Sequence, residues 1–170
     1  MSQVVNYSFM DKKELKKLNY PETDKVYNAI KIMNPISEEY PDMRTTLLPG
    51  LLHTLAYNLA QHNEQISIFE HGHVYQPKSL PLTELPYEYA LVSGLLCGGP
   101  EEKGYPNSDR EYDFFDVKGI MEDVFKALNI KGYETVRSTY PVFHPGISAD
   151  FVKDGKVIAS FGALHPSVLD

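Results

Sequence analysis

Apolar residues recur every three or four positions in two segments of the chain, and this spacing predicts two amphipathic helices. The first helix is expected to begin near 45–48, because Pro49 is tolerated only in a first turn, where its missing N–H would have been unpaired anyway. The second is expected over 113–128, and a short helix is expected after Asp11, a typical N-cap residue. The apolar positions of the two long helices are Leu47, Leu48, Leu51, Leu52, Leu55, Ala56 and Leu59, and Val117, Ile120, Met121, Val124, Phe125 and Leu128.

Seven segments have the alternating or unbroken apolar patterns that are typical of β-strands. The segment 87–97 is almost continuously apolar and is therefore expected at the centre of its sheet, and Asp154-Gly155 predicts a two-residue hairpin. Because hairpins make the sheet largely antiparallel, we expect a single α+β domain over 1–170, with a long mobile loop over 98–112. The predicted strands are 4–9, 29–33, 64–76, 87–97, 133–139, 147–153 and 156–163.

The composition is that of an ordinary globular protein, with 42% hydrophobic and 23% charged residues in 170. No apolar run approaches the ~20 residues of a membrane-spanning helix, so we expect a cytoplasmic protein without a membrane partner. The formal net charge of −7 argues against a general nucleic-acid binder, since that affinity comes from Lys and Arg neutralising phosphates. One local candidate for RNA contact remains, although a solvated lysine face is the favoured interpretation: Lys12, Lys13, Lys16 and Lys17.

Histidines and acids suggest metal sites, but no ligand set is complete. His71 and His73 would project from one face of a strand with Glu70 on the other, and zinc requires three or four ligands. Asp113 and Asp116 could share a cation, yet acids at a helix N-terminus are already favoured by the helix dipole. The sequence therefore predicts no metal site.

Nucleophilic and acid–base catalysis have little support in the sequence. His144 and His165 each precede a proline, where the backbone is extended or turning, so turn histidines are the expected interpretation. Cys97 lies in an apolar run and cannot form an internal disulfide, because it is the single cysteine of the chain. From the residues alone, the chain is an α+β domain without a convincing catalytic set.

Six short stretches, in the same order along the chain, resemble the C-terminal part of the bacterial phenylalanyl-tRNA synthetase beta subunit. The resemblance implies a class II aminoacyl-tRNA synthetase-like fold, in which helices flank an antiparallel sheet, as a catalytic-like module without a complete active site. Arg44, Asp113, Asp116, His144 and His165 belong to these stretches and are candidates for structural or interface roles. The stretches are NPIS at 34–37, MRTTLLPGLL at 43–52, IFEHGHVY at 68–75, DFFDVKG at 113–119, HPGISA at 144–149 and FGALHP at 161–166.

The segment 72–78 resembles the class II signature Gly-x-Val-Tyr-Arg-x-acid, with Gln76 in place of the arginine and Lys78 in place of the acid. In that family the arginine grips ATP and the aminoacyl adenylate, for which a planar guanidinium offers two parallel charge-assisted hydrogen bonds. A carboxamide supplies neither the charge nor the fork. Gln76 and Lys78 are therefore predicted to be degenerate positions, and no cofactor is expected in this fragment, whereas the parent complex uses ATP and Mg.

The resemblance also implies a role and a context. The first class II signature helix would precede Val4 and the third signature would follow 164–166, so we expect a piece of a larger beta subunit. Its expected role is a non-catalytic scaffold that packs on the catalytic alpha subunit and the remainder of beta in a heterotetramer that aminoacylates tRNA(Phe). Two alternatives remain open: a stand-alone class II-like ligase or small-molecule-binding paralogue, and an RNA-contacting module through the lysines at 12–17.

Overall fold

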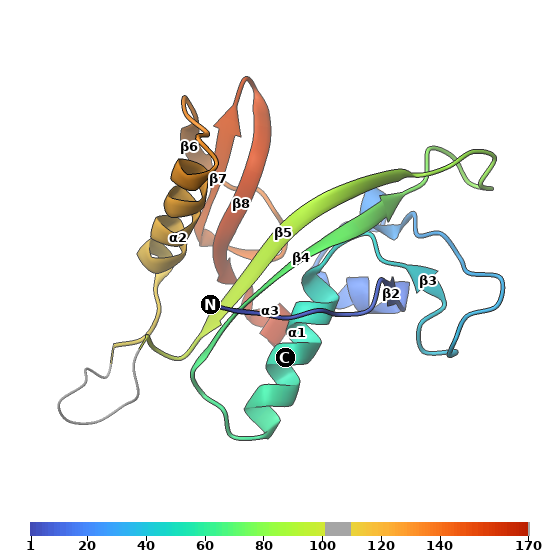
Figure 1. The fold of residues 1–170 in the computed structure, drawn as a ribbon, viewed down its shortest axis with the longest axis horizontal. Coiled ribbons are helices and arrows are strands. Elements are labelled where there is room, and N and C mark those ends of the chain that lie inside the picture. The colour runs from blue at the N-terminus through green and yellow to red at the C-terminus, as the bar shows by residue number, and fades with distance from the viewer. Residues whose placement is uncertain (101–109, 170) are drawn as a thin grey trace. The chain divides into compact units, whose positions relative to one another are not determined.

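The computed structural model of the chain describes residues 1–100 and 110–169 (Figure 1). Two compact units make up the chain, unit 1 over Met1–Arg110 and unit 2 over Glu111–Asp170. The single domain over 1–170 stays a prediction, and most of the loop expected over 98–112 lies outside the described residues. No described helix is long and apolar enough to cross a membrane.

Unit 1 is built on a three-stranded sheet with the order β1-β4-β5. β4 (Ile66–Gln76) pairs antiparallel with β5 (Tyr87–Cys97) along eleven residue pairs, and β1 (Ser2–Gln3) runs parallel to β4 on its other side. β4 is thus the central strand and β5 an edge strand among the described residues, so the central position predicted for 87–97 is wrong there. The continuous apolar run of β5 does not mark burial, because the side chains of its first half are exposed.

Helix α1 (Leu48–Ala60) packs against this sheet. Pro49 lies in its first turn, as predicted, and Leu51 and Leu55 are buried against Ile66 and Ile68 of β4. The apolar stripe does not stay buried to the end of the helix, since Leu59 is 42% exposed. The core of unit 1 therefore lies under the first two turns of α1.

The first part of unit 1 contains less regular structure than the sequence predicts. Of the strand predicted over 4–9, only the last residue belongs to a strand, β2 (Phe9–Met10), and residues 4–8 connect β1 to it. β2 pairs with β3 (Asp42–Met43). The strand predicted over 29–33 is wrong: Lys31 forms one isolated bridge to Asp42, and the 3-10 helix η2 (Lys25–Tyr27) lies just before it. The helix predicted after Asp11 is confirmed as the 3-10 helix η1 (Lys12–Leu18), whose Lys13 amide donates to the Asp11 carboxylate.

Unit 2 packs one helix against a three-stranded antiparallel sheet with the order β6-β7-β8. Its helix is α2 (Phe114–Ala127), its strands are β6 (Glu134–Arg137), β7 (Phe143–Lys153) and β8 (Lys156–Leu164), and the short helix α3 (Pro166–Leu169) follows. The predicted Asp154-Gly155 hairpin is confirmed, and both residues have the positive φ that such turns require. The buried core of this unit is aromatic: Phe125, Phe151 and Phe161 surround Ala149.

The face of α2 that packs on the sheet differs in part from the prediction. Val117, Met121 and Phe125 contact the core as expected, but Val124 is 38% exposed and Leu128 is 66% exposed. The buried stripe instead continues towards the start of the helix through Phe114, whose ring stacks on Phe161 with centroids 5.1 Å apart. The helical period thus predicts α2 correctly, but the face of α2 that is buried is narrower than its apolar pattern indicates.

Replacement of Phe151 by alanine should destabilise unit 2 strongly. The side chain is fully buried and contacts three aromatic rings, and such truncations cost about 3–5 kcal/mol in the free energy of unfolding. The matched control is Phe115→Ala, because that side chain is 73% exposed and its loss should cost less than about 1 kcal/mol. Denaturant unfolding measures both, and equal effects would contradict the aromatic core.

Candidate functional site

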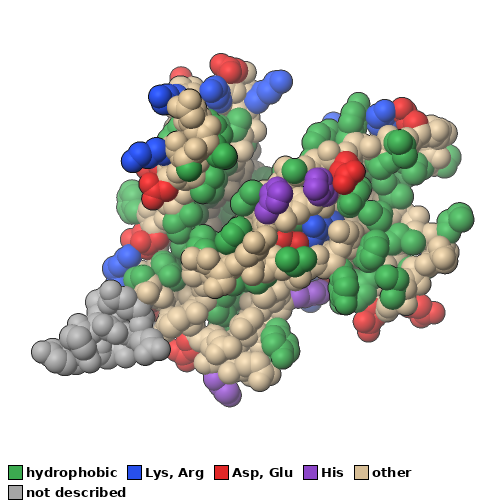
Figure 2. Space-filling model, in the orientation of Figure 1, with side chains coloured by type: hydrophobic (Ala, Val, Ile, Leu, Met, Phe, Trp, Pro, Cys, Tyr) green, Lys and Arg blue, Asp and Glu red, His purple; other side chains and the backbone are tan. Residues whose placement is uncertain are grey.

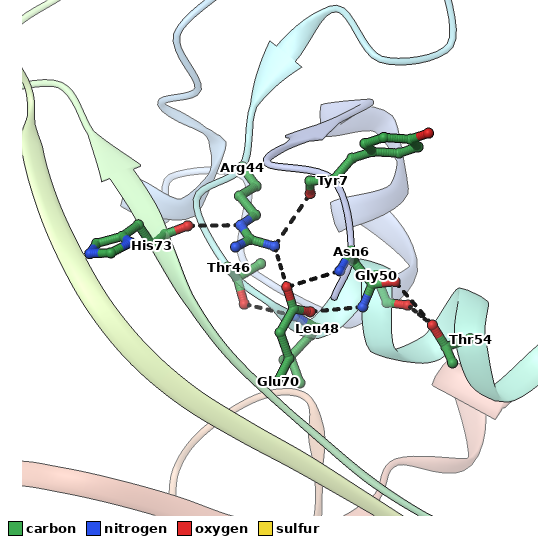
Figure 3. A network of polar contacts seen from close by, with 9 residues as sticks. All are labelled: Asn6, Tyr7, Arg44, Thr46, Leu48, Gly50, Thr54, Glu70 and His73. Atoms are coloured by element: carbon green, nitrogen blue, oxygen red, sulfur yellow. Dashed lines mark hydrogen bonds and ion pairs between the residues drawn. The ribbon is translucent and has the colours of Figure 1, made fainter. Parts of the chain in front are cut away.

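An ion pair is buried at the centre of unit 1 (Figure 3). Arg44 follows β3 directly, and Glu70 lies in the middle of β4. The distance between Arg44 Nη1 and Glu70 Oε1 is 2.6 Å, and the two side chains are only 7% and 2% exposed. A charge removed from water in this way is stable only if further hydrogen bonds satisfy it.

Those further hydrogen bonds come from three other parts of the unit. Arg44 Nε donates to the carbonyl of His73 at 2.8 Å, and Nη1 donates to the carbonyl of Tyr7 at 3.3 Å. Asn6 Nδ2 donates to Glu70 Oε2 at 2.7 Å, while the Thr54 hydroxyl of α1 donates to Asn6 Oδ1 at 3.0 Å. The network joins β4, α1 and the segments around 6–7 and 44, so it ties these four parts of unit 1 to one another.

Gly72 makes room for the guanidinium. It lies two residues after Glu70 on the same face of β4, and a Cβ built there would overlap Arg44 Nη2. Substitution would therefore displace the buried arginine. The glycine of the 68–75 stretch thus has a structural role that does not involve nucleotide binding.

The two positions that are predicted to be degenerate lie at the end of β4, Gln76, and two residues beyond it, Lys78. Gln76 pairs with Tyr87 in the β4–β5 ladder and is partly buried. Lys78 pairs with Glu84 of the loop between the strands, with 2.6 Å between Nζ and Oε2, and its ammonium lies 5.1 Å from the ring centroid of Tyr87. The hydrogen bond to Glu84 raises the pKa of the Lys78 ammonium above its ordinary value. Position 78 thus holds a cation in a local loop contact, where the signature has an acid.

The other sequence candidates are distributed over both units. His71 and His73 share the face of β4 opposite Glu70, with ring centroids 6.4 Å apart, but no three His, Cys, Asp or Glu side chains of the described residues are placed to hold a metal ion. On η1 four lysines are exposed and Leu15 and Leu18 are buried beneath them. The four lysines are Lys12, Lys13, Lys16 and Lys17.

In unit 2 the candidates make local contacts. Asp113 and Asp116 form a capping box, in which each carboxylate accepts a hydrogen bond from the other residue's backbone N–H. His144 Nδ1 accepts from the Gly146 amide at 3.1 Å, and His165 Nδ1 accepts from the Ser167 amide at 3.2 Å. These contacts give all four residues a turn or cap position, and their roles as interface residues stay predictions.

The partners of Arg44 are residues that the sequence pattern did not single out as a site. The sequence predicts Glu70 only as a strand residue that faces away from His71. It gives no sign that Asn6 or Thr54 contacts the site. One signal was available: a charged residue at the centre of an otherwise apolar strand must be paired if its face is buried. This signal does not reveal that the partner of Glu70 is Arg44, which is 26 residues away in the sequence.

Replacement of Gly72 by alanine should destabilise unit 1 by about 1–3 kcal/mol, the usual cost of forcing an atom into a filled space. The matched control is Gly119→Ala in α2, where an added Cβ meets nothing within 4 Å. That change should stabilise the protein by about 0.5–1 kcal/mol, because alanine is the better helix former. Opposite signs in denaturant unfolding are expected, and a neutral Gly72→Ala would contradict the packing of Arg44.

Replacement of Arg44 by methionine should cost about 3–5 kcal/mol in the free energy of unfolding, since it leaves the Glu70 carboxylate buried and unpaired. Adding Glu70→Gln should recover part of this loss, because an amide carries no charge to desolvate. Arg137→Met is the control, since the Arg137 side chain is exposed and donates its hydrogen bonds to the carbonyl of Pro145. If Arg44→Met and Arg137→Met have equal effects, the ion pair contributes little to stability.

Comparison with solved structures identifies the fold. The chain is similar to the crystal structure of pyrrolysyl-tRNA synthetase from Desulfitobacterium hafniense, with a TM-score of 0.66 and 22% identity over 97% of this chain and 53% of that one. A second structure, of PylSc from the same organism, gives a TM-score of 0.61 and 23% identity over 93% and 49%. The predicted α+β fold of class II synthetases is therefore confirmed.

Comparison of sequences identifies the family. The chain is 34% identical over 169 residues to the phenylalanine–tRNA ligase beta subunit of Carboxydothermus hydrogenoformans, covering 99% of this chain and 21% of that protein. It is 36% identical over 168 residues to the beta subunit of Hahella chejuensis, covering 98% and 20%. The chain thus spans about a fifth of the length of the curated relatives it matches. The family model described as the phenylalanyl tRNA synthetase beta chain CLM domain matches residues 1–170, and the chain belongs to that family.

Proposed function

We propose that this chain is a non-catalytic scaffold domain of a cytoplasmic phenylalanine–tRNA ligase, which packs on the catalytic alpha subunit and the remainder of the beta subunit. In this role it helps to hold the heterotetramer that attaches phenylalanine to tRNA(Phe) with ATP and Mg. Catalysis belongs to the alpha subunit, and this domain contributes assembly.

The observation that carries the proposal is the chemistry at the end of β4. Adenylate formation develops negative charge on the α-phosphate, and enzymes stabilise that charge with preorganised cationic donors. Gln76 is neutral, and the Lys78 ammonium is already paired with Glu84 at 2.6 Å. Neither side chain can replace a forked guanidinium at this position.

Arg44, whose side chain pairs with Glu70 of β4, does not replace the arginine that is absent at position 76. The Arg44 guanidinium is 7% exposed and donates to two carbonyls as well as to Glu70. A guanidinium that is buried and already neutralised by a carboxylate is poorly suited to binding a nucleotide phosphate. Arg44 therefore supports a structural interpretation of this region.

Exposed apolar surface supports a role in assembly. On β5, Tyr87, Leu91 and Val92 are 51%, 42% and 65% exposed, and Leu85 in the preceding loop is 85% exposed. Figure 2 shows many hydrophobic side chains on the surface in view, several of them around the loop between β4 and β5. Apolar patches of this kind are typical of protein–protein contacts.

The purified chain should show no phenylalanine-dependent ATP–pyrophosphate exchange, with or without the substitution Gln76→Arg, because Lys78 remains paired. The complex of alpha and full-length beta is the positive control. Deleting from a full-length beta subunit the segment that corresponds to residues 1–170 of this chain should prevent co-purification with alpha. Aminoacylation should be lost with it. Robust exchange by the isolated chain, or normal assembly without it, would contradict the scaffold role.

A further inference from the structure

Unit 1 contains a cavity of about 220 Å³, and Arg44 of the ion pair is one of the residues that line it. It lies between η1, the first turns of α1 and the segment 6–10. The residues that matter for its chemistry are Tyr7, Glu14, Tyr40, Arg44 and His53, all of which line it. The degenerate positions at 76 and 78 do not line it.

The size of the cavity limits what can enter. Pockets for cofactors and drug-sized ligands usually enclose about 300–1,000 Å³. A cavity of about 220 Å³ is below that range and suits one long side chain. The cavity is therefore smaller than a typical nucleotide pocket.

The charges in the wall favour a cation. Arg44 is neutralised by Glu70 at 2.6 Å, so it offers no net charge to the cavity. The Glu14 carboxylate is 30% exposed and lies 3.1 Å from His53 Nε2. Glu14 is the acid among the lining residues, and its carboxylate can accept hydrogen bonds from an incoming cation.

Two aromatic rings stand in the same wall. The centroids of Tyr7 and Tyr40 are 5.9 Å apart, with 55° between the ring planes, and Tyr7 is 71% exposed. Aromatic faces attract cations, and a guanidinium also stacks on a ring through its plane. Lysine has a compact, strongly hydrated ammonium and loses more hydration in such a site.

We propose that this cavity binds one arginine side chain presented by a partner protein, with Glu14 pairing the guanidinium and Tyr7 or Tyr40 stacking on it. The assignment follows from volume, charge and aromatic lining alone. It stands whether or not the scaffold role is correct, since it concerns a cavity that the degenerate site does not include.

The test titrates the isotope-labelled chain with N-acetyl-arginine methylamide at pH 8 and follows backbone amide shifts. Saturable shifts at residues around 7, 14, 40 and 53 are expected, with a Kd in the millimolar range for a single side chain. N-acetyl-citrulline methylamide has the same shape without the charge and should bind about tenfold more weakly. Absence of saturable shifts, or equal binding of citrulline, would overturn the proposal.

Variants separate recognition from structure. Glu14→Gln and Tyr40→Leu should each weaken arginine binding, by about tenfold and about threefold, whereas Glu39→Gln, an exposed acid outside the lining, should not change it. His53→Ala removes the competing partner of Glu14 and should strengthen binding, an effect that loss of structure cannot produce. Unchanged affinity in Glu14→Gln, or weaker binding in His53→Ala, would refute the site. None of these measurements uses ATP or the alpha subunit, so their outcome is independent of the test of the scaffold role.

Discussion

The buried ion pair between Arg44 and Glu70 holds unit 1 together. The guanidinium donates to carbonyls of chain segments far apart in sequence, and the carboxylate accepts from Asn6. The Arg44 carbonyl also accepts from the Tyr75 amide at 2.9 Å. Desolvating two charges costs several kcal/mol per ion, which only such complete pairing can offset. Because the cost falls on any arrangement that leaves one charge alone, the pair selects a single relation between α1, β4 and the segments that border them.

The same requirement separates two kinds of charge in this molecule. Arg44 is charged, buried and committed to the protein's own groups, whereas Lys78 is charged, largely solvated and paired only within a loop. Active sites for phosphoryl chemistry need a third arrangement, a desolvated cation left partly unpaired for its substrate. At the end of β4 the described side chains do not provide such a cation, since Gln76 is neutral and Lys78 is paired with Glu84.

The elements that could be predicted from the sequence are those with strong local signals. The period of 3.6 in α1 and α2, the Asp11 cap and the Asp154-Gly155 turn each depend on neighbours within a few residues, and each is present. Pairing and burial depend on distant residues, which explains the errors. The apolar run of β5 predicts a central strand, yet β5 lies at the edge of its sheet among the described residues, and 29–33 forms a bridge rather than a strand. Glu70 was visible as an acid in a strand, but its arginine could be identified only from tertiary contacts.

The contact between Lys78 and Glu84 has a consequence for the history of the domain. On the proposed function, regaining activity would require an arginine at 76 and an acid at 78. An acid at 78 would face Glu84 where the present cation lies 2.6 Å from it, so two carboxylates would repel each other in the loop. A reversal at 78 alone therefore meets a penalty before it brings any benefit, so positions 76, 78 and 84 would have to change together. On the proposed function, the contact between Lys78 and Glu84 would therefore make the loss of catalysis hard to reverse.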